Sequence, residues 1–410
     1  MQDENNTKNN KNTEQTTKKL KIGLFIDTFF PMVDGVINVV DNYARRLCEK
    51  HDVTVFTVKP RKKGYDDGKF PYKVVRCDRI KTSFLDYDMP IPSLDMKFKK
   101  ELNSGDFDII HVHSPFAVGK LGISYAKRHK IPAVATLHSQ YYKDFLRESH
   151  SKVLSKTLLR GVINAFDKCD ECWAVNSEVG RIYYEEYGLK NLPLTRNNGT
   201  DMKPLENCDD EIAGLRKTYG ITTNEKVLLF VGRITNLKNV FFIADSLKIL
   251  KDQNFKFKML FVGSGPDEEK LKKKVENYGL SDDVVFTGRI TDKRVLSLHY
   301  KLADLFLFPS LYDCSSLVQI EAAAQKTPAL FLQGSATSAT VTDGVNGYLS
   351  EATPPPFARR IVQIFKDTED YNRICENCFN DLFVGWDDAV ALAEKDYYRL
   401  IDLKKQQTKK

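Results

Sequence analysis

Two cationic side chains lie five residues apart in the second half of the chain, in the segment Gly232-Arg-Ile-Thr-Asn-Leu-Lys238. An apolar run that predicts a strand ends directly before them. Arg offers a planar fork to two phosphate oxygens, and Lys offers a movable point charge. Arg233 and Lys238 therefore suit a diphosphate whose negative charge grows as it leaves. The alternative for this spacing is a pair of solvated surface cations.

Two acidic side chains follow some 80 residues later, around a predicted helix start. Asp313 precedes the helix and Glu321 lies inside it. Ser316, followed three residues later by Gln319, matches a capping box, which predicts that the helix begins at Leu317. A helix N-terminus favours phosphate. A carboxylate in so apolar a run is rarely buried without a partner, and the alternative is a glutamate that faces solvent.

Glycines and histidines also follow predicted strands. Gly263-Ser-Gly265 lacks the third glycine of a dinucleotide fingerprint, so it is typical of a tight turn. Gly35 opens the first predicted helix, where backbone N–H groups could reach a phosphate, although an ordinary helix start explains it equally. His113 and His138 each end a predicted strand. A lone histidine is more often a satisfied polar residue than a catalyst, but strand ends are where ligands bind in parallel sheets.

The elements that position these residues alternate between strand and helix along the chain. Buried strands are predicted at residues 21–26, 53–58, 108–112, 132–137 and 171–175, and again at 227–231, 259–262, 284–287, 305–308 and 329–332. Helices are predicted at 36–50, 241–253 and 386–404. The alternation predicts an α/β protein with two doubly wound domains. We divide the chain into a disordered tail (1–19), a first domain (20–199), a second domain (200–385) and a C-terminal helix (386–410) that returns to the first domain.

The acidic pair resembles the Glu-x7-Glu segment of glycosyltransferase family 4 (group 1), whose members are retaining enzymes with the GT-B fold. Ala322-Ala323 and Thr327-Pro328 extend the resemblance. The chain departs from the family in two ways, because the first acid is Asp313 and the usual Phe-Gly after it is Ser315-Ser316. The resemblance covers about residues 20–400 and implies two Rossmann-like domains that face a central cleft.

The resemblance assigns roles to individual residues. The residues implied in catalysis are His138 and Asp313, which would position the donor sugar, and Arg233 and Lys238, which would hold its diphosphate. The residues implied in donor binding are Gly35, Gly232, Arg233, Lys238, Gly263, Arg289, Ile290, Ser316, Leu317 and Glu321, with Glu321 on the ribose and Arg289 and Ile290 near the nucleobase. His113 is implied on the acceptor side.

The implied reaction is retaining transfer of a hexose from a nucleotide sugar, with UDP expected, to a glycan or membrane glycolipid. No metal or other cofactor is expected, because cationic side chains and helix N-termini replace the metal in this family. A diacylglycerol glucosyltransferase is one alternative. Others are a GT-B epimerase or phosphorylase and a non-enzymatic, basic peripheral membrane protein with a degenerate sugar site.

Charge is distributed unevenly along the chain. Residues 20–199 carry 29 Lys and Arg against 22 Asp and Glu, whereas residues 200–410 carry 29 against 30. Residues 151–168 predict a helix with Leu154, Leu158, Val162 and Phe166 on one face and Lys152, Lys156 and Arg160 on the other. The basic face is either simply solvated or in contact with an anionic membrane. The basic residues lack interleaved aromatics, so nucleic acid is not an expected partner.

No signal peptide or membrane-spanning segment is evident in the sequence, which predicts a cytoplasmic protein. Contact of the basic helix with an anionic membrane would place it peripherally on the inner membrane face. Eight cysteines include the pairs Cys169/Cys172 and Cys375/Cys378. The two pairs lie too far apart for the usual zinc spacing, so we predict reduced structural cysteines and no metal site.

Overall fold

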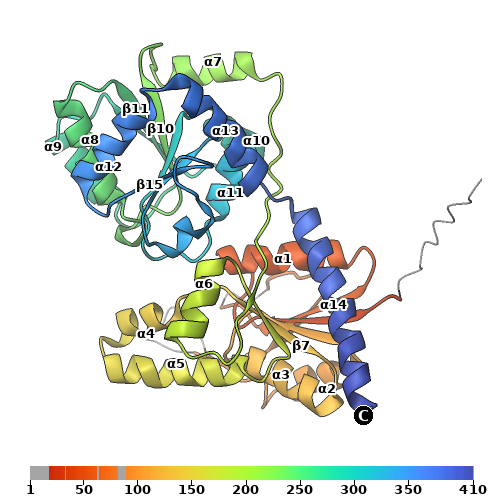
Figure 1. Ribbon diagram of the computed structural model, residues 1–410. Coiled ribbons are helices and arrows are strands. Elements are labelled where there is room, and N and C mark those ends of the chain that lie inside the picture. Colours follow the sequence, from red (N-terminus) through yellow and green to blue (C-terminus); the bar gives the residue numbers. More distant parts are fainter. Residues whose placement is uncertain (1–17, 33, 62–63, 82–88, 410) are drawn as a thin grey trace, which may run out of the picture.

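The computed structural model describes residues 18–32, 34–61, 64–81 and 89–409. The predicted tail, apart from Lys18 and Lys19, lies outside the described residues. Figure 1 shows two domains, one above the other, with the chain passing between them near residues 200 and 385. Each domain contains a parallel sheet with helices on its faces. The predicted α/β architecture is therefore confirmed.

The sheet of the first domain has seven parallel strands in the order β3-β2-β1-β6-β7-β8-β9. In chain order these strands are β1 (Lys21–Phe25), β2 (Asp52–Val58), β3 (Lys73–Cys77), β6 (Ile109–Val112), β7 (Ala133–Leu137), β8 (Glu171–Ala174) and β9 (Leu194–Thr195). A short antiparallel pair, β4 (Arg79–Ile80) and β5 (Met89–Pro90), lies outside this sheet. The strands β6 and β7 are buried along their whole length, as expected for a sheet covered on both faces.

The helices of the first domain follow these strands. They are α1 (Gly35–Leu47), α2 (Met96–Ser104), α3 (Ala117–His129), α4 (Tyr141–Ser149), α5 (Lys152–Phe166) and α6 (Ser177–Arg181), which continues as a π-helix over Ile182–Glu186. Asp34 caps α1 by accepting a hydrogen bond from the Ile37 N–H. At α3 the buried Asp27 carboxylate accepts hydrogen bonds from the Val118 and Gly119 N–H groups, so a strand-end residue supplies the cap.

The second domain has six parallel strands in the order β12-β11-β10-β13-β14-β15. They are β10 (Lys226–Val231), β11 (Phe257–Val262), β12 (Val284–Gly288), β13 (Leu305–Phe308), β14 (Ala329–Leu332) and β15 (Tyr348–Ser350). The helices are α7 (Asp209–Thr218), α8 (Val240–Asp252), α9 (Glu268–Asn277), α10 (Lys293–Leu302), α11 (Leu317–Ala324), α12 (Pro354–Ile364) and α13 (Thr368–Leu382), with 3-10 turns at Asn236–Lys238 and Ala336–Thr340. Both β13 and β14 have the predicted bounds.

The last helix, α14 (Trp386–Thr408), leaves the second domain and packs along the first (Figure 1). Trp386, Tyr397 and Ile401 are buried in the same apolar cluster as β1 and α1. The rings of Trp173 and Tyr397 stack with their centroids 5.7 Å apart. This packing anchors the end of the chain to the domain in which it begins.

The two chain crossings are hydrogen-bonded to each other. The Thr200 N–H donates to the Val384 carbonyl at 2.9 Å, and the Trp386 N–H donates to the Thr200 carbonyl at 3.3 Å. A Cβ on Gly199 would lie 2.7 Å from the Trp386 nitrogen, so only glycine permits this approach. The connection is therefore a narrow, paired hinge.

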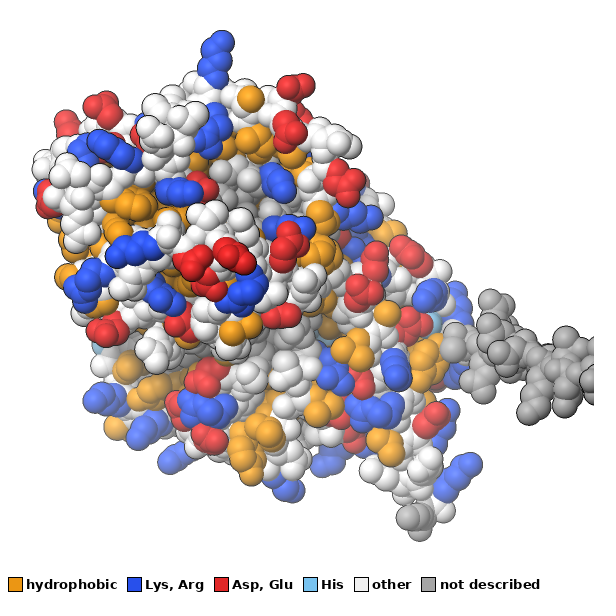
Figure 2. Space-filling view, turned by 45° about the horizontal axis from the view of Figure 1, so that its top comes forward, with side chains coloured by type: hydrophobic (Ala, Val, Ile, Leu, Met, Phe, Trp, Pro, Cys, Tyr) orange, Lys and Arg blue, Asp and Glu red, His pale blue; other side chains and the backbone are white. Residues whose placement is uncertain are grey.

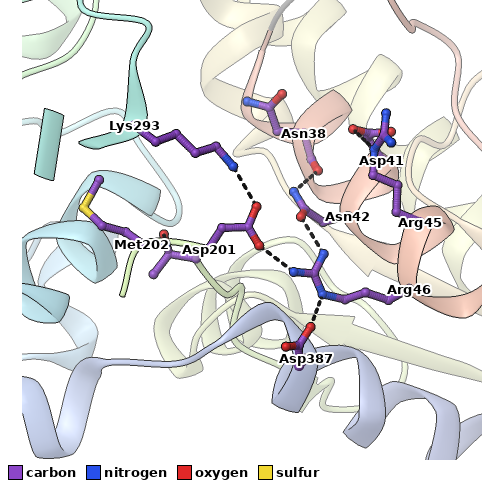
Figure 3. A network of polar contacts seen from close by, with 10 residues as sticks. Asn38, Asp41, Asn42, Arg45, Arg46, Asp201, Met202, Lys293 and Asp387 are labelled. Carbon is purple, nitrogen blue, oxygen red and sulfur yellow. Dashed lines mark hydrogen bonds and ion pairs between the residues drawn. The ribbon is translucent and has the colours of Figure 1, made fainter. Parts of the chain in front are cut away.

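A network of charged side chains bridges the domains beside this hinge (Figure 3). Asp201 accepts a hydrogen bond from Arg46 of α1 at 2.5 Å and from Lys293 of α10 at 2.8 Å. Arg46 also donates to Asp387 at 2.6 Å. Partial burial alone would raise the pKa of Asp201, but the hydrogen bonds and charges of Lys293 and Arg46 lower it. Asp201 thus joins one cation from each domain.

Candidate active site

The predicted donor residues of the second domain follow its strands, whereas Gly35 lies on the first domain. Because β12, β11, β10 and β13 are adjacent and parallel, their carboxyl ends share one edge of the second sheet. The Gly232 N–H donates to the Val262 carbonyl at 3.0 Å, and the Gly263 N–H donates to the Gly288 carbonyl at 2.9 Å. Three strand-end loops are therefore held together as one surface.

Two glycines at this edge lie against the backbone of the loop after β10. Gly263 has a φ of +134°, and a Cβ there would lie 1.9 Å from the Gly232 carbonyl oxygen. Gly265 is equally constrained, because its Cβ would lie 2.2 Å from the Ile234 oxygen. Tight packing of two loops thus explains both glycines.

On the first domain, a Cβ on Gly35 would meet nothing within 4 Å, so the start of α1 has open space beside it.

Lys238 and Asp313 form a direct ion pair in which the lysine ammonium donates to the aspartate Oδ1. The second oxygen, Oδ2, accepts a hydrogen bond from the Ser310 hydroxyl at 2.6 Å. The Lys238 ammonium also lies 5.4 Å from the centroid of the Phe308 ring. The predicted diphosphate cation and the predicted sugar-binding acid therefore already touch.

Arg233 lies in the loop directly after β10 and is exposed. Within the described part of the chain no hydrogen bond or ion pair engages its guanidinium group. An exposed guanidinium group without a carboxylate partner keeps its full charge and its bidentate geometry for an incoming anion.

Glu321 lies on α11 and is partly buried. Its Oε2 accepts a hydrogen bond from the Tyr300 hydroxyl at 2.8 Å. Burial raises the pKa of Glu321, while the Tyr300 hydrogen bond and the Lys293 charge act in the opposite direction. Glu321 is therefore not a free surface carboxylate, and Tyr300 holds it in one orientation.

The predicted capping box at α11 is wrong. Ser316 occupies the N-cap position, but its hydroxyl makes no capping hydrogen bond, and its Oγ is buried without a partner. The Gln319 side chain instead donates to the Thr340 hydroxyl at 3.0 Å, which draws it away from the helix start. Among the described residues, no side chain therefore caps the first turn of α11, whose N–H groups carry the positive end of the helix dipole.

The first domain contacts the loop that carries Asp313. Gln140 donates to the Tyr312 carbonyl at 3.1 Å, and Lys143 of α4 donates to the Leu311 carbonyl at 3.1 Å. Arg147 donates to the Tyr312 hydroxyl at 2.6 Å, with its guanidinium carbon 5.1 Å from the ring centroid. An open hollow of about 390 Å³ adjoins this contact and is lined by Lys143, Asn236, Leu237, Asn239, Leu311 and Tyr312. The two domains are therefore in direct contact at α4.

A second cavity, of about 280 Å³, lies between the domains on the hinge side. Asn176 and Asn198 from the first domain face Ser315, Ser316 and Gln319 from the second. Asn176 donates to the Cys314 carbonyl at 2.6 Å and to the Ala336 carbonyl at 2.9 Å. Both ends of the Asp313 loop are therefore bonded to the first domain.

The two predicted histidines lie together on the first domain. His138 follows β7 and is partly buried, and its Nε2 lies 3.1 Å from Nδ1 of His113. Burial lowers the pKa of His138 to about 3 and that of His113 well below its ordinary value, so both rings are neutral at pH 7. His113 is only 1% exposed. It therefore lies behind His138 and does not reach the surface directly, and its implied role on the acceptor side stays a prediction.

The remaining predicted residues lie at the borders of the site. Arg289 is exposed just after β12, and Ile290 packs against the core of the second domain. Leu317 packs against the apolar cluster of the first domain, so the start of α11 contacts both domains. Lys152, Lys156 and Arg160 are exposed on α5, away from the second sheet.

The predicted apolar face of α5 is wrong in part. Leu154 and Leu158 are 48% and 42% exposed, and Val153 is 78% exposed. The helix instead buries Ser155, Leu159, Val162, Ile163 and Phe166. Because the buried stripe includes Ser155, the apolar residues of the first turns face outward among Lys152, Lys156 and Arg160.

Three site residues were missed by the sequence analysis, namely Tyr300, Ser310 and Tyr312. Ser310 and Tyr312 lie three residues and one residue before the predicted site residue Asp313 in the loop after β13, so their position alone could have indicated them. Tyr300 lies on α10, and no sequence spacing relates it to Glu321. No group of three or more His, Cys, Asp and Glu side chains in the described ranges is arranged to hold a metal ion.

Two family profiles match the chain in succession. Residues 33–201 match the profile of Glycosyltransferase Family 4, and residues 212–381 match that of Glycosyl transferases group 1. An alpha-monoglucosyldiacylglycerol synthase of Streptococcus pneumoniae is 29% identical over 325 residues, which are 76% of this chain and 70% of that protein. The protein with the same description from Acholeplasma laidlawii is 24% identical over 347 residues, 80% of this chain and 84% of its own length.

Solved structures share the fold. Sucrose-phosphate synthase from Thermosynechococcus elongatus superposes with a TM-score of 0.75 at 19% identity, covering 94% of this chain and 100% of that one. Anabaena HepE in complex with UDP gives a TM-score of 0.72 at 18% identity, covering 93% and 99%. The two parallel-sheet domains are therefore the GT-B fold. The chain belongs to the group 1 family of glycosyltransferases and is a transferase enzyme.

Proposed function

We propose that the protein transfers a hexose from a nucleotide sugar, with UDP as the nucleotide, and retains the configuration at the anomeric carbon. The observation that carries the proposal is the contact of Lys238 and Asp313 after the adjacent strands β10 and β13. Arg233 follows β10 as well, and Glu321 lies in α11, whose start has no side-chain cap. Cations and free N–H groups at such an edge match a diphosphate. The solved relative HepE, which was crystallised with UDP, supports the choice of nucleotide.

Each polar group has one task in the proposed reaction. Arg233 and Lys238 bind the diphosphate and stabilise the charge that builds up on it as the glycosidic bond breaks. Glu321, oriented by Tyr300, accepts hydrogen bonds from the ribose hydroxyls. Asp313 accepts a hydrogen bond from a sugar hydroxyl once Lys238 turns to the phosphate. When the donor binds, Lys238 thus exchanges Asp313 for the diphosphate as its partner.

The proposed mechanism uses the leaving phosphate itself as the base for the acceptor hydroxyl on the same face of the sugar. His138 lies on the opposite domain and, as a neutral ring, binds the sugar without carrying charge. In this proposal neither a metal nor another cofactor is required, because Arg233, Lys238 and the N-terminus of α11 supply the positive charge.

A panel of nucleotide sugars tests the proposal through slow donor hydrolysis, scored by released nucleoside diphosphate. We expect hydrolysis of a UDP-sugar, and we expect Arg233→Ala and Lys238→Ala to lower turnover by roughly 10²–10³-fold each. Lys248→Ala, which removes an exposed lysine of α8 paired with Asp252, is the control. Near-normal turnover in both site variants, with folding intact, would contradict the assignment of the diphosphate site.

The acceptor that the structure favours is a lipid at an anionic membrane surface. Val153, Leu154 and Leu158 are exposed on α5 beside Lys152, Lys156 and Arg160, a combination typical of helices that lie in a membrane interface. Figure 2 shows basic and hydrophobic side chains next to one another along the lower edge of the molecule. Two relatives described as alpha-monoglucosyldiacylglycerol synthases support a diacylglycerol-type acceptor. The proposed location is the inner face of the membrane.

The described residues include no helix that is long and apolar enough to cross a membrane. In this proposal the protein attaches to the membrane surface through α5. A soluble glycan acceptor is the alternative, and vesicle binding separates the two, as described in the Discussion.

A further inference from the structure

Three histidines form a buried row along the ends of β6 and β7. The rings of His111 and His113 lie with their centroids 4.0 Å apart, and those of His113 and His138 lie 5.3 Å apart with nearly parallel planes. Tyr43 of α1 packs edge-on against His111 and His113. The row leads from the interior of the first domain to the partly buried His138.

His111 is fully satisfied within the first domain. Its Nδ1 lies 2.6 Å from the Tyr397 hydroxyl of α14, and its Nε2 lies 2.7 Å from the Thr136 hydroxyl. Both partners can donate or accept, so His111 imposes no constraint on its neighbours. Both ring nitrogens of His111 therefore have partners inside the first domain, and neither is available to a ligand in the cleft.

His113 differs because only one of its nitrogens is bonded. Its Nδ1 lies 3.1 Å from His138 Nε2, whereas its own Nε2 is buried and has no hydrogen-bond partner. Native proteins rarely keep a buried polar atom without a partner unless it has a use. The contact with His138 is the one polar interaction recorded for this ring among the described residues.

The two rings can share their hydrogen bond in two ways, and the unpartnered nitrogen distinguishes them. If His138 donated, the proton of His113 would sit on Nε2, which would leave a buried N–H without an acceptor. If His113 donates from Nδ1, its Nε2 is a bare lone pair. A buried N–H without an acceptor is the rarer and costlier of the two defects. The second arrangement is therefore favoured.

We infer that His113 is a positioning residue, which donates from Nδ1–H to His138 Nε2 and thereby keeps the proton of His138 on Nδ1. The inference that this proton serves the donor sugar rests on the proposed function. Burial lowers the pKa of both rings, so neither carries a second proton at pH 7. His138 then presents one N–H donor, in one ring orientation, to a sugar hydroxyl oxygen.

The ring tautomers can be read directly from the intact protein by ¹⁵N NMR of histidine-labelled enzyme at pH 7. Signals of His138 are assigned by their loss in His138→Gln. We expect the pattern of a neutral ring protonated on Nδ1. A ring protonated on Nε2 would overturn the inference. This measurement needs no substrate, so it tests His113 even if no nucleotide sugar were turned over, a result that would contradict only the proposed function.

Two variants of His113 separate positioning from packing. His113→Phe keeps the ring volume and removes the unpartnered nitrogen, so the melting temperature should be unchanged or higher. Turnover of the donor should fall roughly 10- to 100-fold, because a misoriented contact near the reacting atoms is costly. The KM for the donor should change less than kcat. His138 should show a mixture of both tautomers.

His113→Asn places an amide N–H close to the position of Nδ1 and should recover most of the lost turnover. His299→Gln, which alters a histidine of the second domain bonded to Tyr219, is the control for labelling and general stability. Full turnover in His113→Phe would overturn the inference. The inference would also be overturned if the turnover of His113→Phe and His113→Asn changed only in proportion to their melting temperatures.

Discussion

The ammonium group of Lys238 and the carboxylate of Asp313 are hydrogen-bonded across the start of the candidate diphosphate site. Lys238 ends the 3-10 turn after β10, and Asp313 lies in the loop after β13, the neighbouring strand. The side chains are 24% and 19% exposed, so the pair is screened less than a surface salt bridge. An arriving diphosphate must compete with Asp313 for this cation.

Asp313→Asn should tighten the binding of free nucleoside diphosphate, because Lys238 then keeps its full charge for the phosphates. We expect affinity to rise about five- to tenfold, roughly 1–1.4 kcal/mol, measured by calorimetry. Turnover should fall, since the carboxylate that binds the sugar is lost. Asp313→Glu preserves the charge and should retain near-normal diphosphate affinity. Weaker diphosphate binding in Asp313→Asn would show that Asp313 supports Lys238 instead of competing for it.

Glu321→Gln should weaken nucleotide binding, because a charge-assisted hydrogen bond to ribose becomes a neutral one. The expected loss is about 1.5–3 kcal/mol, again measured by titration of nucleoside diphosphate. Tyr300→Phe removes the hydroxyl that orients Glu321 and should cause a smaller loss. The same titration with a 2′-deoxynucleotide is the internal control, since its affinity should be less sensitive to Glu321. Unchanged affinity in Glu321→Gln would exclude the ribose contact.

Replacement of Lys152, Lys156 and Arg160 by Glu should abolish sedimentation with anionic vesicles. Each cation near an anionic surface contributes about 1 kcal/mol, so wild-type binding should be weak and reversible. It should also fall between 0.1 and 1 M salt, because the Debye length shrinks from about 10 Å to about 3 Å. Substitution of Val153, Leu154 and Leu158 by Ser should weaken binding at both salt concentrations, since it removes the apolar contribution.

The matched control for this experiment replaces Lys97, Lys100 and Lys127, three exposed lysines of the same domain, by Glu. It makes the same change in net charge away from α5 and should leave vesicle binding largely intact. Donor hydrolysis should persist in all of these variants. Equal, negligible sedimentation of the wild-type enzyme with anionic and neutral vesicles would contradict the membrane proposal and favour a soluble glycan acceptor.

Asp201→Asn should loosen the two domains, because Arg46 and Lys293 would then face each other without a shared carboxylate. We expect a larger radius of gyration in small-angle X-ray scattering, and 1 M salt should shift the wild-type protein in the same direction. Asp210→Asn, on the exposed start of α7, controls for the loss of one negative charge. An unchanged radius would show that the hinge backbone alone sets the domain positions.

The histidine row predicts that stability falls as the pH is lowered. The pKa of His138 is about 3 in the folded protein against an ordinary value of 6.5, so below about pH 6.5 the unfolded chain binds protons that the folded ring excludes. Urea unfolding at pH 7.5 and pH 5.5 measures the difference. His113→Phe removes one such ring and should lose less stability than the wild-type protein over this interval.

Asp144 changes the stability in the opposite direction. Burial raises the pKa of Asp144 to about 6, so as the pH is lowered the folded state binds this proton before the unfolded chain does, which favours the folded state. This effect is common to both proteins and cancels in the comparison. An identical loss of stability in His113→Phe and in the wild-type protein would show that His113 is protonated in the folded state.

Much of the fold and the position of the site could be predicted from local sequence alone. Fully buried parallel strands read as unbroken apolar runs, which is why β13 and β14 were placed at their observed bounds. The residues directly after such strands must meet at one sheet edge. The sequence alone therefore places Arg233, Lys238 and Asp313 at the same edge of the second sheet.

The interactions between elements were decided only by the tertiary structure. Gln319 donates to the hydroxyl of Thr340, a partner 21 residues further along the chain, instead of completing a capping box. Leu154 and Leu158 face outward because the packing of α5 selects a stripe through Ser155, and a helical pattern with apolar residues on several faces does not specify which one is buried.

The pairings of charged and polar groups were also decided only by the tertiary structure. Nothing in the spacing of Lys238 and Asp313, of Glu321 and Tyr300, or of His113 and His138 indicates that they touch, since each pair joins different elements. Sequence determines which chemical groups arrive at the sheet edge, because strand periodicity is local. Which of them neutralise or orient one another depends on distances set by the packing of whole elements, and these exist only in the folded chain.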